Sequence, residues 1–327
     1  MTNCWIKSAG VSVLVVIALV ILLLTITFLT IRYYRQKFRS LYKSSIVNYC
    51  KNLPDMKNNA RVNVPSDLQE YDYELSRALL NISLITTQSN CKNIVPSPNP
   101  PGFTSQHRIY GKSSRAKYNK LYAIVYTDFD STSGANPGVT DGKMLIVFTG
   151  TFYIDEWISD FSAKQVEAVR LNNYEKGLLV HYGFYDIYTS VRNDIWKLYN
   201  DYKENVSNVF ITGHSLGGAL SSICAFDFSS ENPIHYSFAS PRFASPPLAE
   251  KFDIILPNSM RIHNSADIVP ELPPPVFFKD TLYQHTSGSI PFTNNLGTVG
   301  ANHIPAYLES LPKCVESIAP CRKKIAS

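Results

Sequence analysis

The longest hydrophobic run in the chain lies near its beginning, over residues 8–31. It contains no charged side chain and is dominated by Val, Ile and Leu. At a rise of about 1.5 Å per residue, a helix of this length crosses the hydrocarbon core of a bilayer. We expect a transmembrane anchor rather than a cleavable signal peptide, because the run is long and no small-residue cleavage site follows it. A buried core helix is the other alternative, but helices that are apolar on every face are rare inside domains.

Further along the chain, short runs rich in β-branched and aromatic residues predict β-strands. These runs are Leu121–Tyr126, Met144–Phe148, Val209–Thr212, Tyr236–Ala239, Met260–His263 and Leu282–His285. Apolar residues recur at helical spacing between several of them, over Gly183–Tyr202 and Gly217–Phe228. The alternation of strand and helix predicts an α/β fold with a mostly parallel central sheet and helices on both faces.

Composition divides the chain into five segments. We expect a short N-terminal tail at 1–7, the transmembrane anchor at 8–31, a basic juxtamembrane linker at 32–65, one α/β domain at 66–312 and a basic C-terminal tail at 313–327. Pro65–Asp67 looks like a helix start, because apolar residues follow it at helical spacing. The stretch 96–119 is rich in proline and polar residues, which is typical of a loop.

The formal net charge of +5 is mostly local. Basic residues cluster just after the apolar run and in the C-terminal tail, so the middle of the chain is close to neutral. No basic groove with interleaved aromatic residues is visible, which argues against a nucleic-acid partner.

The side of the membrane that carries the domain is left open by the sequence. The basic residues after the apolar run favour the cytosolic side for a single-pass protein. Two glycosylation sequons, at Asn81 and Asn205, and the nearby pair Cys314 and Cys321 would suit an oxidising compartment instead. Sequons also arise by chance, so the charge rule gives a slight preference for the cytosol.

The motif that carries chemistry is Gly213-His214-Ser215-Leu216-Gly217, which joins an apolar strand to a helix of small residues. In a nucleophile elbow the serine stands on a strained turn at a helix N-terminus, and small residues on either side prevent collisions. We therefore expect Ser215 to be the nucleophile and Gly213 and Gly217 to have a steric role. The alternative is a glycine-rich turn with an idle serine, which the strand-turn-helix context disfavours.

A serine nucleophile needs a histidine to take its proton and a carboxylate to orient that histidine. Asp267 lies just past a predicted strand, and strand ends are where α/β folds mount catalytic groups. Asp253 lies in a helix-like stretch, and Asp280 precedes its predicted strand. We therefore predict Asp267 as the carboxylate, against the alternative of a solvated turn aspartate.

For the histidine we predict His303, which lies in a loop before the last helical segment and fits the order Ser, Asp, His. His263 and His285 lie within predicted strands. His285 stays the main alternative, because a strand histidine could reach the edge of the site. His181 precedes the serine, and we expect His214 to pack beside the elbow.

The tetrahedral intermediate of acyl transfer also needs hydrogen-bond donors for its oxyanion. One predicted donor is the backbone N–H of Leu216, directly after the nucleophile. The second is the N–H of Thr151, which follows the predicted strand at 144–148. A plain glycine-containing turn is the alternative for Thr151. No metal ligand set and no organic cofactor are implied.

Several motifs, in order along the chain, resemble the class 3 (fungal-type) lipase family over about residues 70–312. They are Phe148–Thr151, Trp157–Phe161, Val180–Phe184, Gly213–Gly217, Phe238–Arg242, Asn264–Pro270 and His303–Tyr307. The resemblance implies an α/β-hydrolase fold. It also implies the triad Ser215, Asp267 and His303, with Thr151 and Leu216 as the oxyanion hole, in agreement with the predictions made from the residues.

The resemblance also suggests a lid over the active site. In fungal relatives a helix after the oxyanion strand covers the active site, and the corresponding apolar residues of this chain are Ile154, Trp157, Ile158 and Phe161. A helix that simply packs on the sheet is equally compatible with this spacing.

The chain also departs from the family pattern at two places. Many relatives carry Arg at Thr149 and Gly-Asn at Ala244–Ser245, so we expect local packing to differ there.

These observations predict a membrane-anchored serine lipase or esterase that hydrolyses carboxylic ester bonds of lipids through an acyl-Ser215 intermediate. Acylglycerols are the first expected substrate, and the expected partners are a lipid ester and the bilayer around 8–31. A phospholipase or an acyltransferase on the same scaffold is one alternative. The other is a catalytically inactive membrane protein that binds lipid or a protein partner.

Overall fold

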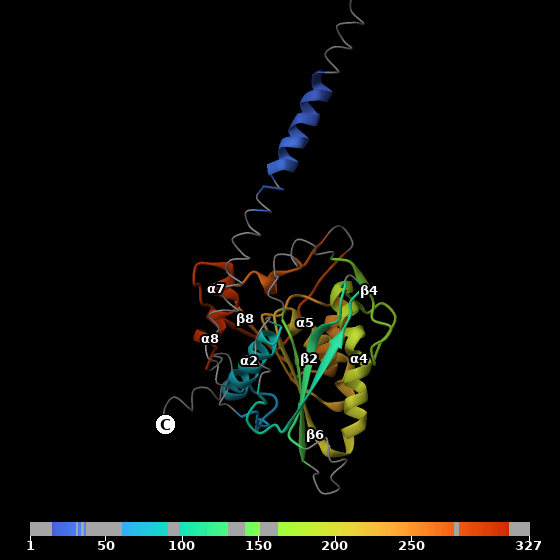
Figure 1. Cartoon of the computed structure of the whole chain (residues 1–327), viewed down its shortest axis with the longest axis vertical. Coiled ribbons are helices and arrows are strands. Elements are labelled where there is room, and N and C mark those ends of the chain that lie inside the picture. Colours follow the sequence, from blue (N-terminus) through green and yellow to red (C-terminus); the bar gives the residue numbers. More distant parts are fainter. Residues whose placement is uncertain are drawn as a thin grey trace, which may run out of the picture. The chain divides into compact units, whose positions relative to one another are not determined.

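The computed structural model of the chain forms two units (Figure 1). One comprises Met1–Pro54 and Tyr153–Ser159, and the other comprises Asp55–Phe152 and Asp160–Ser327. The structure describes residues 15–30, 32–33, 36, 61–90, 98–114, 116–129, 141–150, 163–277 and 281–313.

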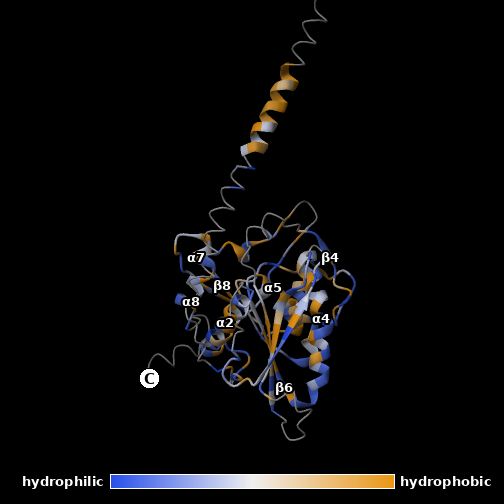
Figure 2. Cartoon of the chain, in the orientation of Figure 1, coloured by the Kyte–Doolittle hydropathy of each residue, from blue (hydrophilic) through white to orange (hydrophobic). Residues whose placement is uncertain are grey.

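The first unit contains an apolar helix over residues 15–30 (Figure 2). The hydroxyls of Thr25 and Thr27 donate to backbone carbonyls one turn earlier, at 2.7 and 2.8 Å, which satisfies these polar groups within the helix. The predicted anchor at 8–31 is thus described only in part. In the described ranges, the structure has no helix that combines the length and the apolar character needed to cross a membrane. The anchor therefore stays a prediction.

The second unit is built on a seven-stranded sheet with the order β1-β2-β3-β6-β7-β8-β9. Its strands are β1 (Ser105–Gly111), β2 (Lys120–Thr127), β3 (Gly142–Phe148), β6 (Val206–His214), β7 (Ile234–Phe238), β8 (Met260–Asn264) and β9 (Ser289–Phe292). The first three strands pair antiparallel, and β3 onwards pair in parallel. A small antiparallel sheet joins β4 (Gln165–Glu167) to β5 (Leu179–His181). The predicted mostly parallel sheet is confirmed.

Helices cover both faces of the large sheet, as predicted (Figure 1). They are α2 (Tyr73–Gln88), α4 (Tyr182–Tyr202), α5 (Leu216–Asp227), α6 (Pro246–Ile255), α7 (Val299–His303) and α8 (Pro305–Ser310), with short 3-10 turns η1 (Lys203–Asn205), η2 (Ser229–Glu231) and η3 (Val269–Glu271). Alternate residues of a strand point to opposite faces. In β3, Leu145 and Val147 belong to the core that α2 covers, whereas the Phe148 ring lies 6.2 Å from that of Tyr188 in α4.

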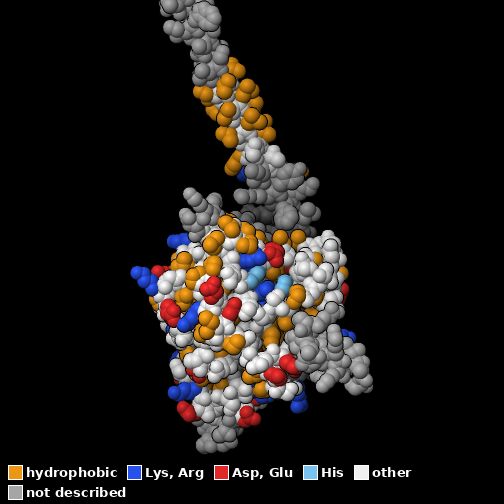
Figure 3. Space-filling model, turned by 180° about the vertical axis from the view of Figure 1, so that it is seen from behind, with side chains coloured by type: hydrophobic (Ala, Val, Ile, Leu, Met, Phe, Trp, Pro, Cys, Tyr) orange, Lys and Arg blue, Asp and Glu red, His pale blue; other side chains and the backbone are white. Residues whose placement is uncertain are grey.

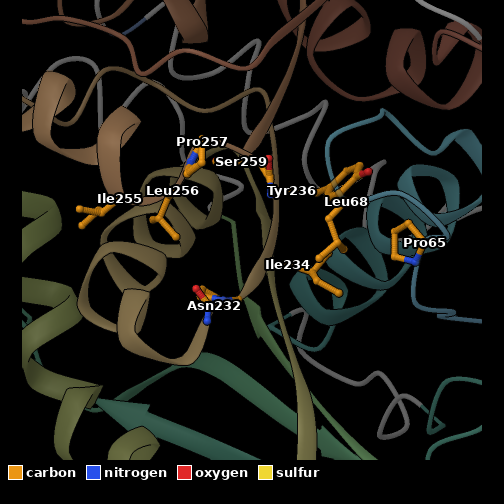
Figure 4. A pocket seen from close by; sticks show the side chains of 11 residues that line it. Pro65, Leu68, Asn232, Ile234, Tyr236, Ile255, Leu256, Pro257 and Ser259 are labelled. Carbon is orange, nitrogen blue, oxygen red and sulfur yellow. The ribbon is translucent and has the colours of Figure 1, made fainter. Parts of the chain in front are cut away.

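The predicted helix start at Pro65–Asp67 is wrong, because α2 begins at Tyr73. Its N-cap is Asp72, whose carboxylate accepts the N–H of Leu75 at 2.9 Å. Asp67 accepts the N–H of Gln69, two positions on, which forms a turn. Pro65 instead helps to line a small pocket beside the first residues of β7 and β8, at the amino edge of the sheet (Figure 4).

One strand prediction and one loop prediction are also wrong. Leu282–His285 is not a strand, since it makes only isolated bridges, and the last parallel strand is β9. The predicted loop at 96–119 contains β1. Both β1 and β9 are edge strands with partly exposed side chains, and β9 contains Pro291. Edge strands need no hydrophobic alternation, so these two carry little strand signal.

Candidate active site

Ser215 lies on a sharp turn between β6 and α5. Its backbone has φ 62° and ψ −125°, a region that L-residues with a side chain rarely adopt. The N–H of Ser215 donates to the carbonyl of Phe238 at 2.9 Å, which fixes the turn to the neighbouring strand β7. Only 3% of the serine surface is exposed. The chain therefore holds this residue in the strained geometry expected of a nucleophile elbow.

The two glycines of the motif have steric reasons to be glycine. A Cβ atom at Gly213 would collide with the carbonyl of Gly217, and one at Gly217 would collide with the carbonyl oxygen of Phe148. Both collisions involve backbone atoms, which cannot move aside. The close approach of α5 to β6 and β3 thus depends on these two positions.

Asp267 and His303 form a buried hydrogen-bonded pair. His303 Nδ1 lies 2.7 Å from Asp267 Oδ2, and both side chains are almost completely buried. The other carboxylate oxygen, Oδ1, accepts the N–H of Val269 at 3.0 Å. Since an ionised carboxylate only accepts, Nδ1 is the protonated ring nitrogen. Nε2 has no hydrogen-bond partner in the described part of the chain and is left to accept a proton.

Tyr307 supplies a further donor to the same carboxylate. Its hydroxyl donates to Asp267 Oδ2 at 3.2 Å and accepts the backbone N–H of Asn264 at 2.9 Å. Burial, and then the charge of Asp267, raise the pKa of Tyr307 well above its usual value, so the phenol stays protonated. The sequence prediction missed this role, although Tyr307 closes the His303–Tyr307 motif.

Two asparagines tie the segment that carries Asp267 to the segment that ends in His303, which is the last residue of α7 and not part of a loop as predicted. Asn264 Nδ2 donates to the carbonyls of Asn302 at 3.0 Å and Asn294 at 2.8 Å. Asn302 Nδ2 donates in return to the carbonyl of Ala266 at 3.0 Å. Because every one of these bonds crosses between the two segments, neither segment can shift without the other.

His214 connects the end of α7 to the elbow. Its Nε2 donates to the carbonyl oxygen of His303 at 2.8 Å, and the two rings lie 4.6 Å apart. Burial, and then the proximity of His303, lower the pKa of His214 well below its usual value, so this ring stays neutral. His214 packs beside the elbow, and it directly precedes Ser215. The structure thereby brings the predicted nucleophile, histidine and carboxylate into one region.

The competing histidines have other partners. His285 Nε2 lies 2.8 Å from the carbonyl of Pro270 and holds the turn η3. Burial, followed by the charges of Arg261 and Arg242, lowers the pKa of His285 to about 2. His263 Nδ1 lies 3.3 Å from a guanidinium nitrogen of Arg261. These contacts give both rings a structural role.

The remaining candidates are placed elsewhere. Nδ1 of His181 accepts the N–H of Phe184 at 3.4 Å and caps α4. Asp253 lies on α6 and accepts the N–H of Ser287 at 2.7 Å. Asp280 is outside the described residues.

Arg242 supports the loop that follows Asp267. Its Nη1 donates to the carbonyls of Glu271 at 2.6 Å and Pro273 at 3.0 Å, and its Nη2 reaches the Glu271 carboxylate at 2.8 Å. A guanidinium can make several such bonds in one plane, which a lysine cannot. The Phe238–Arg242 motif was the sequence signal, but it did not reveal this clamp.

Of the two predicted oxyanion donors, Leu216 lies within the described residues and Thr151 does not. Leu216 opens α5, where a backbone N–H has no helical acceptor and is available to an anion. Thr151 is outside the described residues, but Gly150 before it donates its N–H to Thr87 Oγ1 at 2.8 Å. The proposed lid residues Ile154, Trp157, Ile158 and Phe161 are also outside the described residues. Their roles remain predictions.

The departures from the family pattern are accommodated locally. Thr149 is buried and donates its hydroxyl to the carbonyl of Leu121 at 3.0 Å. Ser245 exchanges bonds with Leu179, donating its N–H to the carbonyl at 2.9 Å and accepting the Leu179 N–H on Oγ at 3.2 Å. Each substituted polar group has found a backbone partner.

A mostly parallel sheet, helices on both faces and a serine elbow at the carboxyl edge are the features that define the α/β-hydrolase class, and this chain has them all. Residues 145–277 match the family model Lipase (class 3). The chain is therefore similar to class 3 lipases over this segment. The matched segment includes Ser215 and Asp267, while His303 lies beyond it.

Individual relatives share part of the chain. The lipase of Rhizomucor miehei is 33% identical over 207 residues, which cover 59% of this chain and 53% of that protein. Phospholipase A1-II 3 of Oryza sativa subsp. indica is 31% identical over 212 residues, covering 54% of this chain and 50% of that protein. The chain spans about half the length of these curated relatives. The solved triacylglyceride lipase of Rhizomucor miehei has 25% identity and a TM-score of 0.48, covering 65% of this chain and 78% of that one.

Proposed function

We propose that the chain hydrolyses carboxylic ester bonds of lipids, with Ser215 as the nucleophile. The observation that carries the proposal is the buried 2.7 Å bond between His303 and Asp267, packed beside the strained Ser215 turn. A serine hydroxyl is a weak nucleophile at neutral pH, so it needs an adjacent base whose tautomer is fixed. His303 has that tautomer, because Asp267 and its partners hold Nδ1 as the donor.

In the proposed reaction the Ser215 hydroxyl attacks the ester carbonyl while its proton passes to His303 Nε2. The Leu216 N–H, with Thr151 as the second predicted donor, stabilises the oxyanion. His303 then gives the proton to the leaving alcohol as the C–O bond breaks, which leaves an acyl-serine. A water molecule repeats the sequence with His303 as base, releasing the fatty acid and restoring the hydroxyl of Ser215.

The proposed substrates are esters of glycerol lipids. The matched relatives are named a lipase and a phospholipase A1, which supports this class without separating its members. We place acylglycerols first. Phospholipids are the second candidate because of the rice phospholipase A1 relatives.

We also propose that residues 8–31 anchor the protein in a bilayer. The support is the uncharged sequence of this run and the apolar helix described over residues 15–30. An anchor would keep the active site where insoluble ester is concentrated. Alkaline carbonate extraction tests it: we expect the full chain to stay with membranes, and its release into the supernatant would contradict the anchor.

The test of the activity is fatty-acid release by the full chain and by Ser215→Ala. The panel comprises triacylglycerol, diacylglycerol, phosphatidylcholine and a short soluble ester. We expect release that the substitution abolishes, and the panel then ranks the substrates. Labelling by a fluorophosphonate, lost in Ser215→Ala, checks the nucleophile independently. Equal background release from both proteins would favour the alternative of an inactive lipid-binding protein.

A further inference from the structure

The carboxyl edge of the sheet exposes a hairpin that the reaction does not use. The hairpin joins β1 to β2, and Gly111 pairs with Lys120 at its base. Since β2 is antiparallel to β3, this base lies beside the carboxyl end of β3, where Thr149 donates its N–H to the carbonyl of Tyr122 at 2.9 Å. Ser215 follows β6, which is parallel to β3 and directly adjacent to it. The hairpin and the elbow therefore share one edge of the sheet.

This hairpin is basic and carries no acidic residue from Gly111 to Lys120. Lys112, Lys117 and Lys120 are exposed, and Tyr118 between them is 78% exposed. An aromatic ring with a polar tip flanked by lysines is typical of a side chain that lies in a membrane interface. The lysine side chains provide cations on the same side of the molecule.

A fourth lysine extends the basic hairpin. Lys164 is exposed, and its ammonium lies 5.5 Å from the ring centre of Tyr182, whose hydroxyl lies 3.0 Å from Ser114 Oγ in the hairpin. The hairpin contacts the carboxylate of Asp186, which accepts both the N–H and the hydroxyl of Ser114 at 2.7 and 2.8 Å. The four lysines outnumber this carboxylate, so the hairpin keeps a positive charge.

Exposed apolar side chains occupy the loops that follow β8 and β9 at the same edge. They are Ile268, Val276, Leu282, Leu296 and Val299, which we call the apolar rim. Ile268 directly follows Asp267, and Val299 begins α7, which ends at His303. Leu282 forms a β-bridge with Val276. Gln284, two residues further on, forms a β-bridge with Ala244, which follows the end of β7, so this part of the apolar rim lies at the same edge of the sheet.

The surface view agrees with this distribution. Figure 3 shows hydrophobic side chains gathered towards the upper end of the second unit, the end where α7 and β4 lie in Figure 1. Exposed apolar side chains that come from several loops on one face indicate an interaction surface rather than scattered surface residues.

We propose that the basic hairpin and the apolar rim dock the catalytic unit on the surface of an anionic phospholipid bilayer. The choice of a bilayer over a protein partner rests on the proposed lipid hydrolysis and on charge complementarity with anionic head groups. The lysines lie at the head-group phosphates, and the apolar rim reaches the boundary of the acyl chains. Docking in this orientation turns the carboxyl edge, and with it Ser215, towards the lipid.

The first test places a tryptophan in the apolar rim of the full chain, as Val276→Trp, on a Ser215→Ala background. The matched control is Ile254→Trp, because Ile254 is 75% exposed at the end of α6, near the amino edge of the sheet. Vesicles contain brominated phosphatidylcholine with or without phosphatidylserine. We expect quenching of the added fluorescence in Val276→Trp, stronger with phosphatidylserine, and little change in Ile254→Trp. Equal quenching in both variants would overturn the proposal.

Charge variants test the hairpin in the same assay. A lysine near an anionic surface strengthens binding to that surface roughly fivefold. Lys117→Gln/Lys120→Gln should therefore weaken binding to vesicles with phosphatidylserine by roughly tenfold or more at low salt. Lys197→Gln/Lys203→Gln removes the same charge from the far end of α4 and should leave contact unchanged. Unchanged contact in the hairpin variant would show that charge does not direct the docking and would refute this half of the proposal.

The docking result does not depend on catalysis, because the Ser215→Ala background holds the lipid intact. In the chain with Ser215, we expect Lys117→Gln/Lys120→Gln to release fatty acid about fivefold more slowly from vesicles that contain phosphatidylserine. Its rate on the short soluble ester should match that of the unsubstituted chain. Preferential quenching of Val276→Trp without hydrolysis by the unsubstituted chain would refute the proposed function alone. Hydrolysis without preferential quenching would refute the docking alone.

Discussion

At the scale of single residues, the Asp267 carboxylate is held by more groups than an orienting role requires. It accepts bonds from His303, Tyr307 and the Val269 N–H. Each donor restrains the carboxylate beside Nδ1 of His303. Tyr307 therefore helps to fix the position of the carboxylate and, through it, the orientation of the His303 ring.

The substitution Tyr307→Phe should lower kcat on the short soluble ester, because the carboxylate that orients His303 loses one of its donors. We expect a loss of about fivefold, since one neutral hydrogen bond contributes about 1 kcal/mol.

The matched control is Tyr199→Phe, since the Tyr199 hydroxyl also donates to a carboxylate, that of Glu231 on η2. Its kcat on the soluble ester should equal that of the unsubstituted chain. An unchanged kcat in Tyr307→Phe would show that the tyrosine is only a packing residue.

At the scale of elements, α4 and α5 are joined through one buried carboxylate. The donors to the Asp227 side chain are the Tyr188 hydroxyl at 2.7 Å, Arg192 Nε at 2.8 Å, Trp196 Nε1 at 2.7 Å and the Asn172 N–H at 2.7 Å. Three of these donors come from α4, while Asp227 ends α5. Because α5 begins at the elbow, this cluster fixes the helix that supports Ser215.

The substitution Asp227→Asn should destabilise the fold by about 3–5 kcal/mol, because it leaves Arg192 without its buried counter-charge. Chemical denaturation with urea measures this change. Asp201→Asn is the control, since Asp201 pairs with Lys197 at an exposed position and such pairs contribute about 1 kcal/mol or less. Equal losses in the two variants would contradict the role assigned to the cluster.

The elements that the sequence predicts well are those whose pattern is local. The central strands are buried on both faces and read as continuous apolar runs, and α4 and α5 begin within one residue of the prediction. The edge strands β1 and β9 lack that pattern. The helix start at Pro65–Asp67 failed because Asp72 provides the cap and only tertiary packing decides between two such turns.

In the candidate site too, a local sequence pattern reveals some of the residues but not others. A local motif marks Ser215, and chain order with strand ends suggests Asp267 and His303. The supporting contacts of Tyr307 and Arg242 join residues 40 and 29 positions apart, so no local pattern reveals them. Folding alone brings these groups together.

At the scale of the whole molecule, acid should destabilise the protein through buried neutral histidines. Burial lowers the pKa of His235 to about 3 and, with nearby arginines, that of His285 to about 2; His214 is also strongly lowered. In the unfolded chain these groups titrate near 6.5, so the unfolded state binds more protons below that pH. Stability is complete above about pH 6.5 and is lost progressively as pH falls towards 3.

Urea unfolding between pH 7.5 and pH 5 measures this dependence. Each histidine should contribute up to about 1.4 kcal/mol for each pH unit below its unfolded pKa. His235→Gln should reduce the slope of the free energy of unfolding against pH by the amount that corresponds to one proton taken up on unfolding. The reason is that His235 is held between the hydroxyls of Ser221 and Ser259 and binds no proton while folded. An unchanged slope in this variant would contradict the assignment.

The two sequons should carry no glycan in the folded protein. Asn205 is only 5% exposed within η1, and Asn81 is half-buried within α2. A glycan needs an exposed asparagine in an accessible segment. We expect no glycosidase-sensitive shift in gel mobility after expression through a secretory pathway. A shift abolished by Asn205→Gln or Asn81→Gln would overturn this expectation, which removes the sequons as an argument for an oxidising compartment.

The order of the site along the chain has a consequence for synthesis. The elbow at Ser215 emerges from the ribosome well before His303 and Tyr307, which follow every strand of the sheet. A growing chain therefore has its serine in place without a base to activate it. Under the proposed function, the nascent polypeptide would not hydrolyse the lipids of membranes that it meets during synthesis. It would become active only when its last described helices pack against the sheet.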